Sequence, residues 1–207
     1  MTQKLFWDVD TQYDFMKSDG KLYVPEAESI IPILEKVTQF ARDHEIPIWG
    51  SVDYHQPDDP EISDQPDFYQ TFPPHCLQGT SGWEKIEATR PKNPLWIDSQ
   101  PIPVEKLKEM IIAHPNEVFF RKQRFDVFTN PNVIPALEVI QPTEIFVYGV
   151  ALDVCDYYAI EGFLKIGRYQ VVLIEDATKP IHPQKAEELL RDWEKRGVRI
   201  IQSHELK

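Results

Sequence analysis

The stretch that decides the fold is residues 145–166, which read IFVYGVALDVCDYYAIEGFLKI. The opening IFVY is an apolar run typical of a buried parallel strand, and the residues from Val154 onward have the pattern of a helix packed on a sheet. Cys155 is therefore expected at a helix start just beyond a strand end, where open α/β sheets place their sites. A helix N-terminus lowers the pKa of a thiol and favours the nucleophilic thiolate. The competing interpretation is an inert cysteine that packs the helix start.

Strand and helix patterns alternate on both sides of this stretch. The expected strands are residues 5–10, 46–52, 118–121, 145–148, 169–174 and 198–201. The expected helices are residues 25–44, 104–114, 131–140, 154–166 and 183–196. This alternation predicts a three-layer α/β sandwich with a central, mostly parallel six-stranded sheet, which is a Rossmann-like fold with right-handed crossovers.

Size and charge narrow the class of protein. The chain has 207 residues, which fits a single domain over residues 1–207, and a formal net charge of -12 that argues against a nucleic-acid partner. No apolar run approaches the length of a bilayer span, so no membrane partner is expected. The first residues lack the apolar core of a signal peptide, and the two cysteines lie far apart, which together favour a cytoplasmic protein with reduced thiols. The oligomeric state stays open, a homo-oligomer included.

Two charged residues are expected beside Cys155 at the carboxyl edge of the sheet. Asp10 ends the first strand, which is expected to be central, so its carboxylate can take the thiol proton and return it to a leaving amine. Lys122 follows the third strand, where its ammonium would stabilise a thiolate and a neighbouring carboxylate. The alternatives are a turn or capping role for Asp10 and an exposed position for Lys122. Arg121 and Arg124 are rival cations.

The periodicity fails in the loop 53–93, and so long a loop in a compact domain is usually functional or disordered. Its Asp53, His55, Glu61 and His75 form a mixed set of nitrogen and oxygen donors, which suits one divalent metal ion with open positions for water or a ligand. Zinc is the expected ion, with iron and manganese as alternatives, because such sites accept all three. Cys76 is not expected to bind the metal. The competing interpretation is a polar surface loop.

These residues come in the order Asp, metal loop, Lys, Cys, each near a strand end. This order resembles the isochorismatase-like cysteine hydrolase superfamily, and within it the nicotinamidase (pyrazinamidase) branch, over residues 4–201. Residues 10–15, DTQYDF, look like the family's D-x-Q-N-D-F, while residues 122–128 and 149–155 look like its K-x-x-x-x-x-F and G-[IV]-A-x-x-x-C. The D-x-H at 53–55 and the P-P-H at 73–75 are the more specific match, because isochorismatases proper lack this metal set.

The resemblance implies the isochorismatase-like hydrolase fold and a role for each matching residue. Asp10 would be the catalytic acid and base, Lys122 the catalytic lysine and Cys155 the nucleophile. The peptide bond between Val150 and Ala151 would be cis, and the backbone amides of Ala151 and Cys155 would form the oxyanion hole. The metal would hold the ring nitrogen of the substrate, orient the ring and supply activated water.

The implied activity is hydrolysis of a small-molecule aromatic amide, namely nicotinamide to nicotinate and ammonia, with Phe15 and Phe72 packed against the ring. Tyr13, Phe72 and Asp156 replace the family's usual Asn, Trp and Val. The changes at Tyr13 and Phe72 favour a second hypothesis, a related amidase that acts on a carbamoyl or ureido compound. A third hypothesis is a non-enzymatic metal-binding protein, because a fold alone does not determine function.

Overall fold

The apolar runs of the sequence become the strands of one parallel sheet in the computed structural model, which describes residues 3–207. The strands are β1 (Lys4–Val9), β2 (Ile48–Asp53), β3 (Leu95–Ile97), β4 (Glu117–Lys122), β5 (Glu144–Val150), β6 (Gln170–Lys179) and β7 (Arg199–Ile201). They lie in the order β3-β4-β2-β1-β5-β6-β7, and every neighbouring pair is parallel. Strand β1 is therefore central, as expected.

The sheet has seven strands, so the prediction of six strands is wrong by one. The additional strand is β3, which has three residues and pairs only with β4 at one edge of the sheet. Three residues give no alternation that a sequence pattern can reveal. Its strand conformation depends on hydrogen bonds to β4, and these form only when the folded chain brings β4 beside it.

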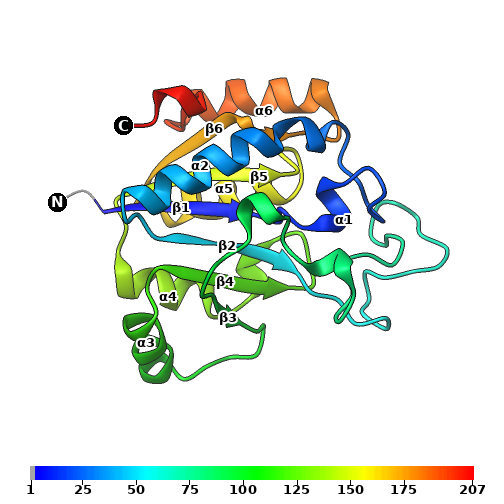
Figure 1. The fold of residues 1–207 in the computed structure, drawn as a ribbon, viewed down its shortest axis with the longest axis horizontal. Coiled ribbons are helices and arrows are strands. Elements are labelled where there is room, and N and C mark those ends of the chain that lie inside the picture. The colour runs from blue at the N-terminus through cyan, green and yellow to red at the C-terminus, as the bar shows by residue number, and fades with distance from the viewer. Residues whose placement is uncertain (1–2) are drawn as a thin grey trace.

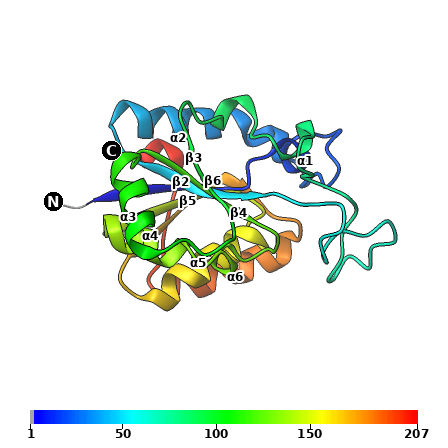
Figure 2. The ribbon, with the colours of Figure 1, turned by 90° about the horizontal axis from the view of Figure 1, so that it is seen from below.

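Helices cover both faces of the sheet, as the α/β pattern predicts (Figures 1 and 2). They are α1 (Tyr13–Met16), α2 (Ile31–Asp43), α3 (Val104–Ala113), α4 (Val133–Ile140), α5 (Cys155–Ile166) and α6 (Pro183–Lys195). Helix α2 packs on one face, and α3, α4, α5 and α6 pack on the other. The helix expected over residues 25–44 starts late, after a 3₁₀ turn at Ala27–Ile30, because Pro32 is tolerated in the first turn of α2 and not in a helix interior.

Each face of the sheet has its own apolar core. Side chains along β1 alternate between the two cores, with Leu5, Trp7 and Val9 in one and Phe6 in the other. The buried strands explain why their sequences read as continuous apolar runs rather than as alternating ones. Among residues 3–207, no helix is long and apolar enough to cross a membrane.

The carboxyl ends of β4, β2, β1 and β5 meet at one edge of the sheet, because these strands are adjacent and parallel. The chain passes from β1 to β2 on one side and returns to β5 on the other, which makes β1/β5 the switch point where such sheets bind ligands. Gly149 allows the backbone of β5 to lie close to that of β1 there. Its φ is 128°, and a Cβ atom at this position would lie 2.0 Å from the carbonyl oxygen of Val9.

The long loop between β2 and β3 is held by bridges within the loop and to the segment after β1, and by an ion pair with the sheet. Gln12 forms an isolated bridge with Lys85, and Ile62 forms one with Phe72. The Lys85 ammonium lies 3.0 Å from the carboxylate of Asp8 on β1, and both side chains are buried. Burial raises the pKa of Asp8, and Lys85 opposes that shift. A buried ion pair therefore anchors the loop to the central strand.

Candidate active site

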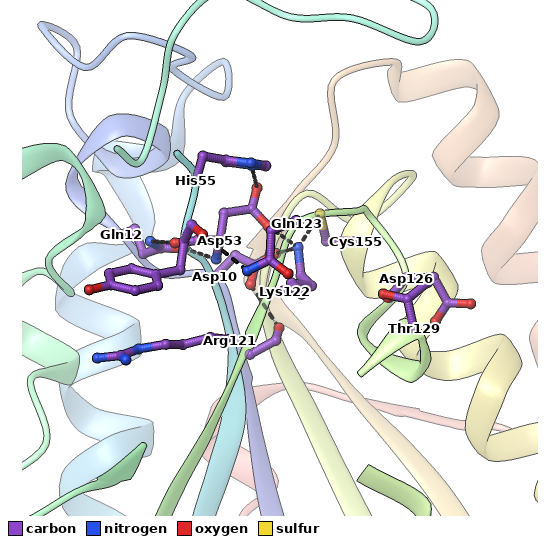
Figure 3. A network of polar contacts seen from close by, with 12 residues as sticks. Asp10, Gln12, Asp53, His55, Arg121, Lys122, Gln123, Asp126, Thr129 and Cys155 are labelled. Carbon is purple, nitrogen blue, oxygen red and sulfur yellow. Dashed lines mark hydrogen bonds and ion pairs between the residues drawn. The ribbon is translucent and has the colours of Figure 1, made fainter. Parts of the chain in front are cut away.

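Three predicted catalytic side chains meet where β1, β4 and β5 end (Figure 3). Asp10 follows β1, Lys122 is the last residue of β4, and Cys155 is the first residue of α5. The Lys122 Nζ atom lies 2.8 Å from Asp10 Oδ2 and 3.7 Å from Cys155 Sγ. Ser51 Oγ donates a hydrogen bond of 2.7 Å to Asp10 Oδ1. All three predicted residues are buried, so their charges interact with little screening by water.

The backbone of Asp10 is strained. Its φ is 47°, in the left-handed region that a non-glycine residue rarely adopts. Strain of this kind persists where the surrounding structure enforces it, commonly at functional sites. Here the Asp10 N–H donates to the carbonyl oxygen of Ser51, and the Asp10 carbonyl oxygen accepts from Gln12 N–H at 2.7 Å. The carboxylate is therefore held in one orientation toward Lys122.

Burial and charge set the protonation states of the three residues. Burial by itself lowers the pKa of Lys122, but Asp10 and Asp53 raise that pKa well above its usual range, so the ammonium stays charged. Burial raises the pKa of Asp10, and Lys122 opposes this shift. Burial also raises the pKa of the Cys155 thiol well above its usual range, again against Lys122. The expected lowering of the thiol pKa is therefore wrong for this site, because desolvation outweighs the helix start and the ammonium.

The backbone around Cys155 offers two N–H groups to a ligand. The peptide bond between Val150 and Ala151 is cis, as the resemblance implies. The N–H groups of Val154 and Asp156 both donate to the carbonyl oxygen of Ala151, which fixes the turn into α5. In the part of the chain from residue 3 to 207, no group accepts a hydrogen bond from the N–H of Ala151 or of Cys155. These are the two amides predicted for the oxyanion hole.

Three of the four predicted metal ligands cluster beside the catalytic residues. One donor atom from each of Asp53, His55 and His75 lies within 4.8 Å of the other two, and all three residues are buried. Asp53 Oδ2 lies 3.7 Å from His55 Nε2 and 3.5 Å from His75 Nε2. The other ring nitrogen of His55, Nδ1, lies 3.3 Å from Asp59 Oδ2. That of His75 lies 2.8 Å from the carbonyl oxygen of Pro73. Such outer contacts orient metal-binding imidazoles.

The donor set fits a divalent ion. His55 Nε2 is buried and has no hydrogen-bond partner among residues 3–207, which is costly unless a further group binds it. Imidazole nitrogens and a carboxylate are suitable ligands for zinc, iron and manganese. The pKa of Asp53 lies well below its usual range, because Lys122 and the two imidazoles outweigh the burial that would raise it. Asp53 is therefore ionised and able to bind a cation.

The fourth predicted ligand, Glu61, lies outside this three-residue cluster. Its side chain is buried, and within the described part of the chain its Oε1 atom has no hydrogen-bond partner. Burial raises the pKa of Glu61, and the Asp53 carboxylate adds to that shift. A nearby cation would thus stabilise the ionised form of Glu61. Its role as a metal ligand stays a prediction. Cys76 is also buried and outside the cluster, and burial raises the pKa of its thiol well above the usual range.

Gln12 positions Asp53, and this role of Gln12 was not predicted from the sequence. Its Nε2 donates to the carbonyl oxygens of Asp53 and Trp83, at 2.7 and 2.8 Å. Its Oε1 accepts from the N–H of Asp53 at 2.7 Å. Both the donor and the acceptor of this buried amide are thus used to hold the end of β2 and the long loop together. The glutamine of the DTQYDF motif was the available signal.

The departure at Asp156 introduces a further buried carboxyl group next to Cys155 in the chain. Thr178 Oγ1 donates to Asp156 Oδ2 at 2.5 Å, while Asp156 Oδ1 has no hydrogen-bond partner in the residues that the structure describes. Burial raises the pKa of Asp156 to about 8, with Thr178 opposing the shift. Asp156 is therefore neutral at pH 7, unlike a surface aspartate.

The two rival cations do not reach Cys155. Arg121 points away from the trio in Figure 3. It packs over the ring of Tyr54, with 4.0 Å between the guanidinium carbon and the ring centroid. Its Nη1 also lies 2.8 Å from Asp98 Oδ1. Arg124 is exposed. Lys122 is thus the cation of this site.

One cavity of about 580 Å³ joins the catalytic and metal-binding residues. Cys155, Asp53 and His75 lie in its wall, together with the predicted ring contacts Phe15 and Phe72. The ring centroids of Phe15 and Phe72 lie 5.6 and 6.4 Å from that of His75. The cavity therefore combines an apolar lining with the predicted nucleophile and two residues of the candidate metal centre.

Comparison with known proteins identifies the family of this chain. The family model described as the isochorismatase domain matches residues 8–205. A search of curated proteins found no match.

Solved structures share the fold. A nicotinamidase/pyrazinamidase from Bacillus subtilis is 22% identical, with a TM-score of 0.74 over 97% of this chain and 100% of that chain. A pyrazinamidase from Pyrococcus horikoshii in complex with zinc is 22% identical, with a TM-score of 0.71 over 97% and 99% of the two chains. An N-carbamoylsarcosine amidase from Thermoplasma acidophilum is also 22% identical, with a TM-score of 0.71 over 99% of each chain.

Proposed function

Because the chain belongs to the isochorismatase family of hydrolases, we propose that it is a cysteine-dependent, metal-assisted amidohydrolase that converts nicotinamide and water to nicotinate and ammonia. One observation carries the proposal. Cys155 of the Asp10–Lys122–Cys155 trio lines the same cavity as Asp53 and His75 of the Asp53–His55–His75 cluster, and Asp53 contacts both Lys122 and the two imidazoles. Solved nicotinamidases with the same fold are consistent with that substrate.

The first half of the reaction forms a thioester. Asp10 takes the proton of the Cys155 thiol as the sulfur attacks the amide carbon, and Lys122 stabilises the negative charge that moves between the two residues. The N–H groups of Ala151 and Cys155 bind the oxygen of the tetrahedral intermediate. Loss of one such donor costs about two to three powers of ten in rate. The C–N bond then breaks, and Asp10 gives its proton to the departing ammonia.

The second half returns the enzyme to its starting state. Water attacks the thioester carbon while Asp10 takes one of its protons. The C–S bond breaks, the carboxylic acid leaves, and the proton returns to Cys155. The raised pKa of Asp10 suits this exchange, since a base works best when its pKa is close to the working pH.

The metal-binding residues would set the substrate against this machinery. Asp53, His55 and His75, with Glu61 as the fourth predicted ligand, would hold one divalent ion, zinc by preference. When bound, the ion supplies a Lewis-acid contact to the ring nitrogen that orients the substrate. Phe15 and Phe72 contribute apolar contacts to the ring.

A carbamoyl or ureido compound is the second candidate substrate. The observation that favours it is the presence of Lys185 and His182 in the cavity lining, where they offer cationic or hydrogen-bonding groups to a carboxylate. Lys185 Nζ already donates to the carbonyl oxygen of Asp153 at 2.8 Å, so its position is defined.

An ammonia-release screen separates the two candidates. Purified protein, supplied with zinc, is incubated with nicotinamide, pyrazinamide, benzamide and an N-carbamoyl amino acid, and a Cys155→Ala sample serves as the blank. We expect ammonia from nicotinamide and pyrazinamide. Release from the carbamoyl compound alone would transfer the assignment to the second candidate, and release from none of the four would refute both.

A further inference from the structure

A row of aromatic side chains leads from the candidate metal centre to the molecular surface. The ring of Phe72 lies 6.4 Å from that of His75 and packs edge-on against Phe125 at 5.2 Å. Phe125 stacks on Tyr158 with 6.2 Å between centroids, and Phe68 contacts Phe72 from the other side at 6.4 Å. We call Phe68, Phe72, Phe125 and Tyr158 the aromatic row. All four line the cavity that contains Cys155.

Both ends of the row, Phe68 and Tyr158, are exposed although they are apolar. Phe68 is 66% exposed and Tyr158 is 38% exposed, and the neighbouring Tyr69, which also lines the cavity, is 81% exposed. Isolated exposed aromatics are common, but a contiguous group beside a cavity usually marks a binding surface. The row therefore has unburied area that a ligand in the cavity would cover.

A turn stabilised by the Asp67 side chain holds the Phe68 end of the row in place. The Asp67 carboxylate accepts hydrogen bonds of 2.8 to 2.9 Å from the N–H groups of Tyr69, Gln70 and Thr71. Phe68, at the tip, has a left-handed backbone with φ 55°, which is a costly conformation for an aromatic residue. The turn thus presents Phe68 and Tyr69 at the mouth of the cavity in a defined arrangement.

The cavity is also larger than a single-ring amide requires. Its volume of about 580 Å³ lies within the range of roughly 300 to 1,000 Å³ that encloses drug-sized ligands. A nicotinamide ring placed between Cys155 and the metal-binding residues would fill only the inner end. Phe68, Phe125 and Tyr158 of the aromatic row would then face solvent during the reaction.

From this continuity we infer that the preferred substrate is an aryl-extended aromatic carboxamide, whose second aromatic group lies along the aromatic row while its amide lies at Cys155. This inference rests on the proposed amidohydrolase function and narrows its substrate class. Stacked and edge-on contacts of the substrate with Phe125, Tyr158 and Phe68 would supply the recognition.

The experiment compares nicotinamide with a set of phenyl-substituted nicotinamides, one for each free ring carbon. We expect at least one phenyl isomer to exceed nicotinamide in kcat/KM by about tenfold or more, the gain typical of burying one aromatic ring. The double substitution Phe68→Ala with Tyr69→Ala should reduce that ratio by about fivefold. Ile112→Ala is the matched control, because Ile112 is 62% exposed on α3 and does not line the cavity, and it should leave the ratio unchanged.

Binding to the Cys155→Ala protein, measured by calorimetry, separates this inference from the proposed function. Tighter binding of a phenyl isomer than of nicotinamide, lost in the Phe68 and Tyr69 double variant, supports the inference even if no amide is hydrolysed. Hydrolysis of nicotinamide with no phenyl isomer preferred in turnover or binding would overturn the inference and leave the proposed function intact.

Discussion

The Asp53 carboxylate joins Lys122 to the candidate metal centre. Its Oδ1 accepts a hydrogen bond from Lys122 Nζ, while its Oδ2 faces the Nε2 atoms of His55 and His75 at 3.7 and 3.5 Å. The register of the sheet creates this contact, because Asp53 on β2 and Lys122 on β4 are paired in the parallel ladder. Lys122, the proposed stabiliser of the nucleophile, and the metal ion proposed to orient the substrate would therefore share one anion.

This sharing predicts different effects for two metal-site substitutions. His75→Ala should remove the metal but leave the trio intact, so turnover of benzamide, which has no ring nitrogen, should change by no more than about twofold. Asp53→Asn should remove the metal and also leave Lys122 with one carboxylate fewer, so kcat for benzamide should fall by about tenfold or more. Steady-state kinetics on benzamide with both variants make the comparison. Equal effects of the two substitutions would show that Asp53 and Lys122 are not coupled in catalysis.

The nucleophile assignment predicts opposite outcomes for the two cysteines. Cys155→Ala should retain the fold and abolish turnover, because no other residue in the trio can form the thioester. Cys76→Ala should keep most of the activity, since Cys76 is buried with its thiol pKa raised and lies outside the trio. Circular dichroism checks the fold and ammonia release checks the activity. An active Cys155 variant together with a dead Cys76 variant would reverse the assignment.

The metal site predicts about one divalent ion per chain after reconstitution with zinc. His55→Ala and His75→Ala should each lower the bound metal strongly, because each removes one of three clustered ligands. His44→Ala is a matched control, since His44 is exposed at the end of α2. Elemental analysis of the dialysed proteins gives the stoichiometry. Metal-free protein with unchanged turnover of nicotinamide would contradict the nicotinamidase proposal and leave a cysteine hydrolase.

Recognition of a ring nitrogen predicts that nicotinamide and pyrazinamide are preferred over benzamide. Benzamide has the same shape but cannot bind the metal, so its amide carbon is less well aligned with Cys155, and misplacement there costs about 100-fold. The preference should appear in kcat/KM and largely vanish in His75→Ala. Comparable kcat/KM for benzamide and nicotinamide in zinc-loaded protein would rule out this role for the metal.

Asp156 predicts a pH dependence of stability. Its pKa of about 8 in the folded protein lies above the unfolded value of about 4, so the stability it contributes is complete below pH 4 and is lost as the pH rises through 8. The free energy of unfolding of the wild type, relative to Asp156→Asn, should therefore fall by about 1.4 kcal/mol per pH unit between roughly pH 4 and pH 8. Asparagine keeps an oxygen for Thr178 and cannot ionise.

Urea unfolding at several pH values checks this expectation. Asp64→Asn is the control, because Asp64 lies exposed in the long loop. A stability difference between wild type and Asp156→Asn that stays constant from pH 4 to pH 8 would show that Asp156 does not titrate in this window.

The sequence by itself determined the layer architecture and the family. Apolar runs and helical spacing are local properties, so the alternation of strands and helices, the central place of β1 and the strand end before Cys155 were all predictable, and the fold and family are confirmed. The motif residues Asp10, Lys122 and Cys155 were predictable for a similar reason, because parallel strands bring their carboxyl ends to one edge wherever the sequence places them.

Only the tertiary structure decided how those residues behave. The thiol pKa of Cys155 is raised rather than lowered, because the burial that dominates it comes from segments far apart in the chain. Other features also depend on partners that are distant in sequence. They are the hydrogen bonds between Gln12 and Asp53, the Lys85–Asp8 ion pair and the pairing of the short edge strand β3. Hydrogen bonding, desolvation and Coulomb energy depend on distances in space, and a pattern read along the chain contains no such distances.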